Sequence, residues 1–296
     1  MSYVLLVLTT LFWSGNFVIS RGMHAEIPPF SLAFWRWVAA FAILSFFAVK
    51  HLWRERELAK KHYRFICIQG LVGVAGFNTL IYLAMQTTTA INAVLVNSCI
   101  PVLIAVCSWV FYREMMTVRQ CFGVLVSLSG VVLIISRGEL AHLLAVSFNQ
   151  GDLLVLFAAL LWAIYSANLK RYPQGLHPMA YQSGIVLFGV LVLVPFYGYE
   201  LVSGKAMQVS VASVGTILYV ALFASVLAFI FWNRAVRTVG ANKAGPFIHL
   251  MPVFSTILAV IFLGEKIQSY HLQGIVMIFI GIAMTTFRVG RREARG

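Results

Sequence analysis

Long apolar stretches separated by short polar segments recur along the whole chain. A transmembrane helix needs about 20 mostly apolar residues, and the chain divides into about ten segments near that length. We expect helices at residues 3–21, 30–49, 64–85, 90–111, 117–136, 152–170, 178–198, 211–232, 241–263 and 271–288. The pattern therefore predicts an all-α membrane protein with ten transmembrane helices.

The composition agrees with a chain embedded in lipid. Of its 296 residues, 61% are apolar and 10% are charged, whereas a soluble domain carries about 25% charged residues. So few polar side chains cannot cover a soluble globule. The first apolar segment has no basic residues before it and no small-residue cleavage site after it, so we interpret it as a permanent helix. The lipid bilayer is thus an expected partner of most of the chain.

The distribution of positive charge predicts the orientation. A net charge of +13 would point to nucleic acid in a soluble protein, but here Lys and Arg concentrate in a few loops and in the C-terminal tail. With ten helices, one side of the membrane receives 17 of these residues and the other receives four. Basic loops stay in the cytoplasm, so we expect both termini there and no nucleic-acid partner.

The two halves of the chain resemble each other in register. Leu11–Trp13 matches Leu160–Trp162, and from the third segment onward a constant offset aligns ten identical residues, among them Pro101 with Pro252. Each half holds five helices, an odd number, so the second half enters the membrane in the opposite sense. Inverted repeats recur in secondary transporters, which bind substrate near the midplane where the copies meet.

Short motifs in both halves are similar to those of EamA-type members of the drug/metabolite transporter superfamily. The matching residues are Trp13–Phe17, Phe34–Arg36, and Pro101 to Glu114 followed by Gly123 and Gly130; the second half repeats the last set as Pro252, Gly264–Lys266, Gly274 and Gly281. The second half departs from the pattern where Ile164–Ser166 replaces Gly15–Phe17.

This resemblance implies two five-helix repeats, at 1–145 and 146–296, that form a basket of ten helices around a central cavity. It also implies export of amino acids or similar small metabolites across the cytoplasmic (inner) membrane of a bacterium.

Polar and aromatic groups inside the predicted helices are candidates for the wall of this cavity, because they can bind a zwitterion through hydrogen bonds and stacking. The candidates for substrate binding are Trp13, Asn16, Asn78, Tyr82, Asn97, Trp162, Tyr165, Trp232 and His249, with Asn233 beside them. For each one alone, a contact between helices or a place in an interfacial belt is an equal alternative.

Ionisable groups at membrane depth are few, which limits the possible mechanisms. His249 is either a substrate contact or proton-sensitive gate, or a core histidine bonded to a neighbouring carbonyl. Arg36 either anchors a substrate carboxylate at the cavity mouth, which the family pattern favours, or extends toward the headgroups. Asp152 begins a helix, Glu114 and Glu265 end helices in structural pairs with basic residues, and we assign the other glutamates to loops or the tail.

Pro101 and Pro252 fall at the centres of the fourth and ninth segments, where they leave the carbonyl groups of Asn97 and Ile248 without a helical hydrogen bond. Such backbone persists at membrane depth only where it faces protein or a watery cavity. Its repetition in both halves favours a hinge or cavity wall over a structural kink.

Small residues share one face of the fifth and tenth segments: Gly123, Ser127 and Gly130 in the fifth, and Gly274 and Gly281 in the tenth. They permit close helix packing, within one bundle or in a dimer. We expect a monomer, with the dimer as the alternative.

The sequence thus predicts a secondary transporter that exports small neutral or zwitterionic metabolites, such as amino acids, by alternating access at a midplane cavity. A drug or quaternary-cation exporter of the same fold is the alternative, although it usually needs a midplane acid. A membrane enzyme is disfavoured, because a single aspartate cannot build a Mg²⁺ site and no HExxH, GxSxG or phosphate-binding motif is present. The four cysteines form no CxxC pair, so we expect no metal, no cofactor and no disulfide.

Overall fold

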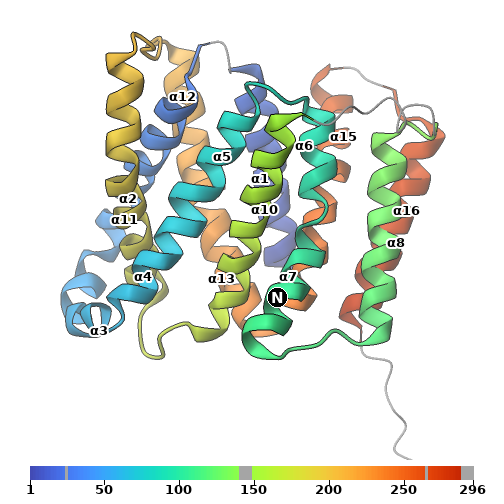
Figure 1. Cartoon of the computed structure of the whole chain (residues 1–296), viewed down its shortest axis with the longest axis horizontal. Coiled ribbons are helices and arrows are strands. Elements are labelled where there is room, and N and C mark those ends of the chain that lie inside the picture. Colours follow the sequence, from blue (N-terminus) through green and yellow to red (C-terminus); the bar gives the residue numbers. More distant parts are fainter. Residues whose placement is uncertain (24–25, 140–148, 264–265, 288–296) are drawn as a thin grey trace, which may run out of the picture.

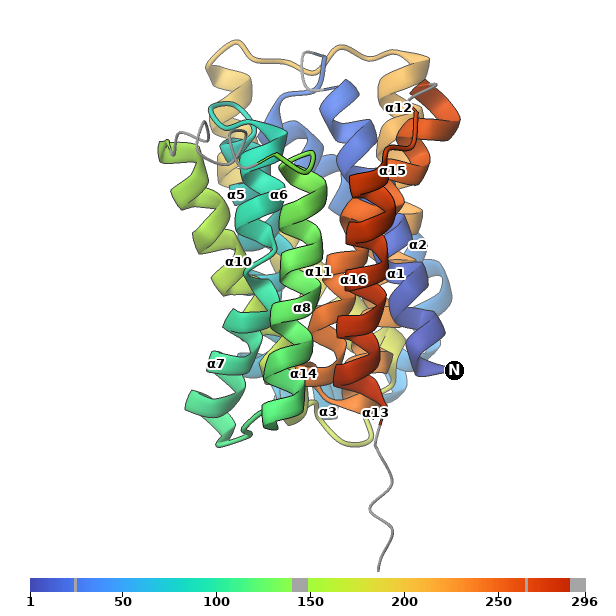
Figure 2. The same ribbon diagram turned by 90° about the vertical axis from the view of Figure 1, so that its right-hand side faces the viewer.

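The structure is a computed structural model that describes residues 1–23, 26–139, 149–263 and 266–287. Every regular element in these ranges is helical, and the helices stand side by side in one bundle (Figure 1 and Figure 2). The predicted all-α fold class is confirmed.

The first half of the chain forms five crossings, of which the third and fourth are built from shorter pieces. In order they are α1 (Ser2–Gly22); α2 (Pro29–Arg54), followed by the short α3 (Arg56–Lys61); α4 (Tyr63–Gln69), the π-helix η1 (Gly70–Gly76) and α5 (Phe77–Ala84); α6 (Ala90–Asn97) and α7 (Ile100–Tyr112); and α8 (Val118–Ile135).

The second half follows the same plan. Its elements are α10 (Gln150–Asn168) with the 3-10 turn η2 (Leu169–Arg171); α11 (Pro178–Val202); α12 (Val211–Tyr219), the π-helix η3 (Val220–Leu227) and α13 (Ala228–Val239); α14 (Ala241–Ala244), the 3-10 helix η4 (Gly245–His249) and α15 (Leu250–Leu263); and α16 (Ser269–Thr286).

Nine helical segments among the described residues are long and apolar enough to cross a membrane. The ninth predicted segment, 241–263, is not among these nine, and it is divided into α14, η4 and α15. Figure 2 shows α14 at the lower end of the bundle and α15 at the upper end, so the three pieces together make the ninth of ten crossings. The start of α1 and the end of α16 lie at the same end, as an even number of crossings requires (Figure 1).

The two halves pack against each other through equivalent pairs of helices. Helix α1 packs against α13 and α15 of the second half, and α10 packs against α5 and α7 of the first. Likewise α2 contacts η3 while α11 contacts η1, and the pairs α2 with α11 and α8 with α16 pack on each other. Each contact has a counterpart with the halves interchanged, which is the packing expected of an inverted repeat.

The third crossing of each half widens into a π-helix at its middle, η1 in one half and η3 in the other. Such segments are rare and occur often at functional sites. Glycine permits a close approach here, since a Cβ atom at Gly73 would overlap the ring of Tyr165 on α10. The apolar pattern of these segments did not predict the widening.

Helices α8 and α16 form a closely packed pair at one edge of the bundle (Figure 1 and Figure 2). A Cβ atom at Gly130 would lie 2.6 Å from the carbonyl oxygen of Gly274, and one at Gly123 would lie 2.6 Å from that of Gly281. The small residues singled out in the sequence therefore serve contact within one chain.

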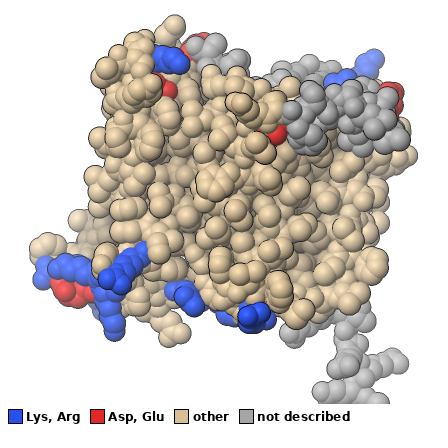
Figure 3. Space-filling view, in the orientation of Figure 1, with Lys and Arg blue, Asp and Glu red and all other residues tan. Residues whose placement is uncertain are grey.

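Lys and Arg side chains gather at the lower end of the bundle in Figure 3, around α3, and few lie at the opposite end. We call the end that carries α3 the basic end. There Lys170 Nζ lies 2.6 Å from Glu114 Oε1, which confirms the expected structural pairing of Glu114. Glu265 and the basic tail from Arg288 onward lie outside the described residues.

Glu200 corrects one expectation, because it lies buried in α11 rather than in a loop. Its carboxylate accepts hydrogen bonds from the backbone N–H groups of Phe30 and Ser31, at 3.0 and 2.6 Å, and from the Ser31 hydroxyl at 2.7 Å. It thereby caps the first turn of α2, where free N–H groups favour negative charge. The prediction was wrong because the helix continues to Val202, beyond the predicted end at residue 198.

Asp152 begins α10, as predicted. Its carboxylate accepts from the backbone N–H of Asn149 at 2.8 Å, from Asn92 Nδ2 at 3.0 Å and from the Thr88 hydroxyl. In the described spans, Asp152 and Glu200 both stabilise helix starts, and neither lines the central cavity.

Candidate functional site

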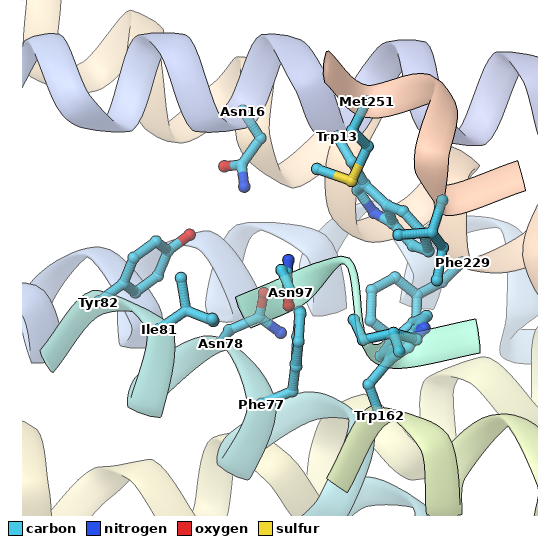
Figure 4. A pocket seen from close by; sticks show the side chains of 12 residues that line it. Trp13, Asn16, Phe77, Asn78, Ile81, Tyr82, Asn97, Trp162, Phe229 and Met251 are labelled. Atoms are coloured by element: carbon cyan, nitrogen blue, oxygen red, sulfur yellow. The ribbon is translucent and has the colours of Figure 1, made fainter. Parts of the chain in front are cut away.

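A cavity lies between the two halves, with walls from both (Figure 4). Six of the predicted substrate-binding residues line it: Trp13, Asn16, Asn78, Tyr82, Asn97 and Trp162. The remaining lining residues were not predicted: Phe77, Ile81, Ile100, Phe229, Ile248 and Met251. These six are apolar residues in apolar helices, so no sequence signal distinguishes them from residues that face lipid.

The cavity is nearly closed. The part that a water molecule can enter is only about 30 Å³, which is room for a few waters. Figure 4 shows Asn16 directed from α1 toward Asn97 on the opposite wall. A metabolite would fit only after the walls moved apart.

Arg36 lies directly behind this wall and is 1% exposed. Its Nε donates to Ser225 Oγ at 2.9 Å, and its Nη1 donates to Asn78 Oδ1 at 3.0 Å and to the Tyr82 hydroxyl at 2.5 Å. Asn78 and Tyr82 both line the cavity. The guanidinium group is therefore directed into the bundle rather than toward the headgroups, and no carboxylate of the described residues forms an ion pair with it within 4.0 Å.

Arg36 also connects the two π-helices. Ser225, its partner in η3, donates to the carbonyl oxygen of Val220 at 2.9 Å. Asn78, its partner at the start of α5, donates to the carbonyl oxygens of Gly73 and Val74 in η1, each at 3.4 Å. A π-helix displaces carbonyl groups from the regular pattern, and here one side chain from each half bonds them. Arg36 is thus linked by hydrogen bonds to both π-helices, through Ser225 and Asn78.

Two polar atoms of the cavity wall have no hydrogen-bond partner among the described residues: Asn97 Oδ1 and Trp162 Nε1. A buried polar atom left unpaired costs about 1–3 kcal/mol, so such atoms are uncommon in folded proteins. The Asn97 oxygen is an acceptor, whereas an indole N–H is a donor. These two unpaired groups, one acceptor and one donor, belong to residues of the cavity wall.

Tyr165 and Trp232 were predicted to bind substrate but lie one layer behind the wall. Both residues pack behind Trp162, which belongs to the wall. The Tyr165 ring stacks on Trp162 with centroids 5.1 Å apart, and the Trp232 ring lies 5.7 Å from Trp162. Tyr165 donates its hydroxyl to Asn233 Oδ1 at 2.7 Å, and Trp232 Nε1 donates to Ser166 Oγ at 3.2 Å.

His249 does not line the cavity either, and it is 1% exposed. Its Nε2 lies 2.9 Å from the carbonyl oxygen of Ser98, and its Nδ1 lies 2.7 Å from Ser127 Oγ. A carbonyl oxygen can only accept, so Nε2 carries a proton. This is the geometry of a core histidine bonded to a neighbouring carbonyl, one of the two alternatives drawn from the sequence.

Pro101 and Pro252 each lie in the first turn of a helix that follows a break. Helix α6 ends at Asn97 and α7 begins at Ile100; in the second half the break is a change from the 3-10 helix η4, which ends at His249, to α15, which begins directly at Leu250. Residues at both breaks, Asn97 and Ile248, line the cavity. The interrupted backbone therefore faces the cavity and neighbouring protein, as membrane-embedded backbone must.

A sequence model of the EamA-like transporter family matches the chain twice, over residues 1–136 and 149–287. The chain belongs to the EamA-like transporter family. Similar proteins include an uncharacterized transporter of Archaeoglobus fulgidus, 29% identical over 290 residues that cover 96% of this chain and 97% of the relative. Another is the uncharacterized transporter YyaM of Bacillus subtilis (strain 168), 25% identical over 282 residues, or 95% of this chain and 92% of the relative.

The fold of this EamA-like transporter also matches a solved crystal structure with a TM-score of 0.80 at 18% identity, over 96% of both chains. The family and its relatives identify the chain as a multi-pass membrane transporter rather than an enzyme.

The transporter has a second, wider cavity between α11 and α13 at the basic end, which we call the basic-end cavity. Water can enter about 360 Å³ of it. It is lined by Tyr172, Pro178, Tyr181, Gln182, Ile230, Asn233, Arg234, Arg237 and Thr238. Apart from Asn233, the sequence analysis did not single out these residues, because their charges and hydroxyl groups looked like ordinary loop and helix-end residues.

Proposed function

We propose that this transporter exports small neutral or zwitterionic metabolites, such as amino acids, by alternating access at the central cavity. The observation that carries the proposal is the buried guanidinium of Arg36 beside the cavity, with no carboxylate partner among the described residues. A buried charge at membrane depth is costly unless it is compensated. A substrate carboxylate would supply the missing negative charge.

The hydrogen bonds of Arg36 leave room for such a ligand. Its Nε and Nη1 atoms donate to Ser225, Asn78 and Tyr82, and no described residue accepts from Nη2. A guanidinium carries two N–H groups on that nitrogen, and it binds a carboxylate more strongly than a neutral acceptor. Arg36 would therefore hold the carboxylate from behind Asn78 and Tyr82.

The two unpaired atoms of the cavity wall suit the two charged groups of an amino acid. Asn97 Oδ1 would accept a hydrogen bond from the ammonium group, and Trp162 Nε1 would donate to a carboxylate oxygen. The aromatic and aliphatic remainder of the wall suits an apolar side chain. A quaternary cation fits less well, since no acid lines the cavity in the described residues.

The near closure of the cavity supports alternating access. A metabolite enters only if the walls separate, and the breaks before Pro101 and Pro252 are places where helix segments can rotate without losing regular hydrogen bonds. In this mechanism the π-helices move with Arg36, so binding of a carboxylate and movement of the walls are linked.

The test is transport by the purified protein in proteoliposomes, with each amino acid compared with its carboxamide and its decarboxylated amine. We expect transport of the amino acid and weak transport of both analogues. Arg36→Gln should reduce transport about tenfold or more, because a hydrogen bond to a charged group contributes about 1.5–3 kcal/mol. Arg64→Gln, which removes an exposed arginine at the basic end, is the matched control.

Monodisperse elution of both variants would exclude misfolding as the cause. Transport of the amines in preference to the amino acids would contradict the proposal and favour a cation exporter. Repeating the assay with and without a pH gradient distinguishes uniport from proton coupling.

A further inference from the structure

We propose that the basic-end cavity is a second substrate site, at which the carboxylate of the metabolite is bound before it passes to the central cavity. The inference rests on the proposed function, because the ligand is the same class of molecule. It adds a location and two arginines that the central cavity does not use.

Two arginines and, among the described residues, no acid line this cavity. Arg234 and Arg237 both line it, and no carboxylate of the described residues forms an ion pair with either within 4.0 Å. The guanidinium carbon of Arg237 lies 3.5 Å from the ring centre of Tyr172, and a cation placed over an aromatic face is held in position. Burial raises the pKa of Tyr172 to about 12; the charge of Arg237 lowers it and that of Glu55 raises it. The phenol therefore stays neutral and leaves the charge of Arg237 available to an anion.

A buried donor at the inner wall gives the second, independent observation. Gln182 on α11 lines the cavity and is completely buried. Its Oε1 accepts from Asn233 Nδ2 at 3.0 Å, whereas its Nε2 has no hydrogen-bond partner among the described residues. An amide N–H without an acceptor beside two arginines is complementary to a carboxylate oxygen.

The basic-end cavity is one layer of side chains away from the central cavity. Asn233 lines the first, and it accepts the hydroxyl hydrogen bond of Tyr165. Tyr165 stacks on Trp162, which lines the second. Tyr165 stands between the cavities, with its hydroxyl bonded to Asn233 and its ring packed on Trp162 and Phe229, so the cavities connect only if its side chain moves.

The order of events follows from this arrangement. A metabolite with a carboxylate binds first to Arg237, Arg234 and Gln182 in the wider, open cavity. It then displaces Tyr165 and exchanges these partners for Arg36. At both sites an arginine therefore pairs with the carboxylate, which compensates its negative charge at membrane depth.

The experiment compares Arg237→Gln with Arg171→Gln in proteoliposomes. Arg171 is the matched control, because it also lies over a tyrosine ring, Tyr112 at 5.2 Å, but does not line the cavity. The probes are a transported amino acid and its carboxamide. We expect Arg237→Gln to raise the KM of the amino acid about fivefold and to leave that of the carboxamide nearly unchanged. Arg171→Gln should match the wild type.

Arg234→Gln, an exposed and therefore well-tolerated substitution, should shift the KM of the amino acid in the same direction. An unchanged KM in both variants, or an equal rise for amino acid and carboxamide, would overturn the inference.

The same assay in vesicles of phosphatidylcholine, with and without phosphatidylglycerol, separates the substrate from a lipid headgroup. An effect seen only with phosphatidylglycerol would also overturn the inference and assign the cavity to lipid. If the wild type transports no carboxylate-bearing compound, the proposed function itself fails. If it does and the variants behave as wild type, only the second site fails.

Discussion

The Nε2 atom of His249 lies 2.9 Å from the carbonyl oxygen of Ser98, and this contact joins the break in one half of the transporter to the break in the other. Ser98 follows the last residue of α6, and His249 is the last residue of η4. Water is scarce at this depth, so a carbonyl group released by a helix break needs a protein partner. His249 supplies it, and its Nδ1 adds a second contact to Ser127 on α8.

Replacing His249 by Ala should lower the unfolding temperature, because it removes both contacts and leaves buried polar atoms unpaired, at about 1–3 kcal/mol. A charged imidazole would be costly here without an acid beside it. We therefore expect transport by the variant to keep the wild-type pH dependence between about pH 5 and 8. The measurements are thermal unfolding in detergent and transport across that range, with His62→Ala as control. Loss of the pH dependence in His249→Ala alone would instead identify a proton-sensitive gate.

Trp162→Phe tests the unpaired donor in the central cavity. Phenylalanine keeps most of the packing and removes the N–H, so stability should stay the same or rise. The affinity for a transported amino acid should fall about tenfold, because a hydrogen bond to a carboxylate is lost. Trp37→Phe is the control, since Trp37 is also buried with an unpaired Nε1 but does not line the cavity. Equal affinities of the two variants, measured by isothermal titration, would exclude Trp162 as a substrate ligand.

Pro101→Ala and Pro252→Ala test the hinge hypothesis. Alanine restores a backbone N–H and favours a continuous helix across each break. We expect transport to slow several-fold while the unfolding temperature is maintained or rises. Pro195→Ala is the control, because Pro195 lies inside α11 on an exposed face. If Pro101→Ala and Pro252→Ala both transported at the wild-type rate, the hinge hypothesis would be wrong and these prolines would be structural kinks.

Gly130→Ala tests the close contact of α8 with α16. The new Cβ would lie 2.6 Å from the carbonyl oxygen of Gly274, so the helices must separate, at about 1–3 kcal/mol. Gly198→Ala is the control, since no atom lies within 4 Å of its new Cβ and alanine favours a helix. Thermal unfolding should show a loss for the first and no loss for the second. Equal unfolding temperatures would mean that the pair can move apart without cost.

The length and polarity of the apolar segments determined the number of crossings and the inverted repeat, because lipid imposes the same length and apolar composition on every crossing. Residue type also identified most polar groups of the central cavity. Asn16, Asn78 and Asn97 could be predicted because an amide in a transmembrane helix must face protein or water rather than lipid.

Only the tertiary structure decided which polar residues reach the cavity and which lie behind it. Tyr165, Trp232 and His249 have the same kind of sequence environment as Trp13 and Trp162, yet they lie one layer back. The sequence also could not predict the apolar wall around Phe229 or the hydrogen bond of Arg36 to Ser225. The physical reason is that a transmembrane helix is apolar on the face toward lipid and largely apolar on the face toward its neighbours. The apolar pattern therefore shows that a helix crosses the membrane, but it does not show which face of the helix is directed into the bundle. Packing between the two halves determines which face is directed inward.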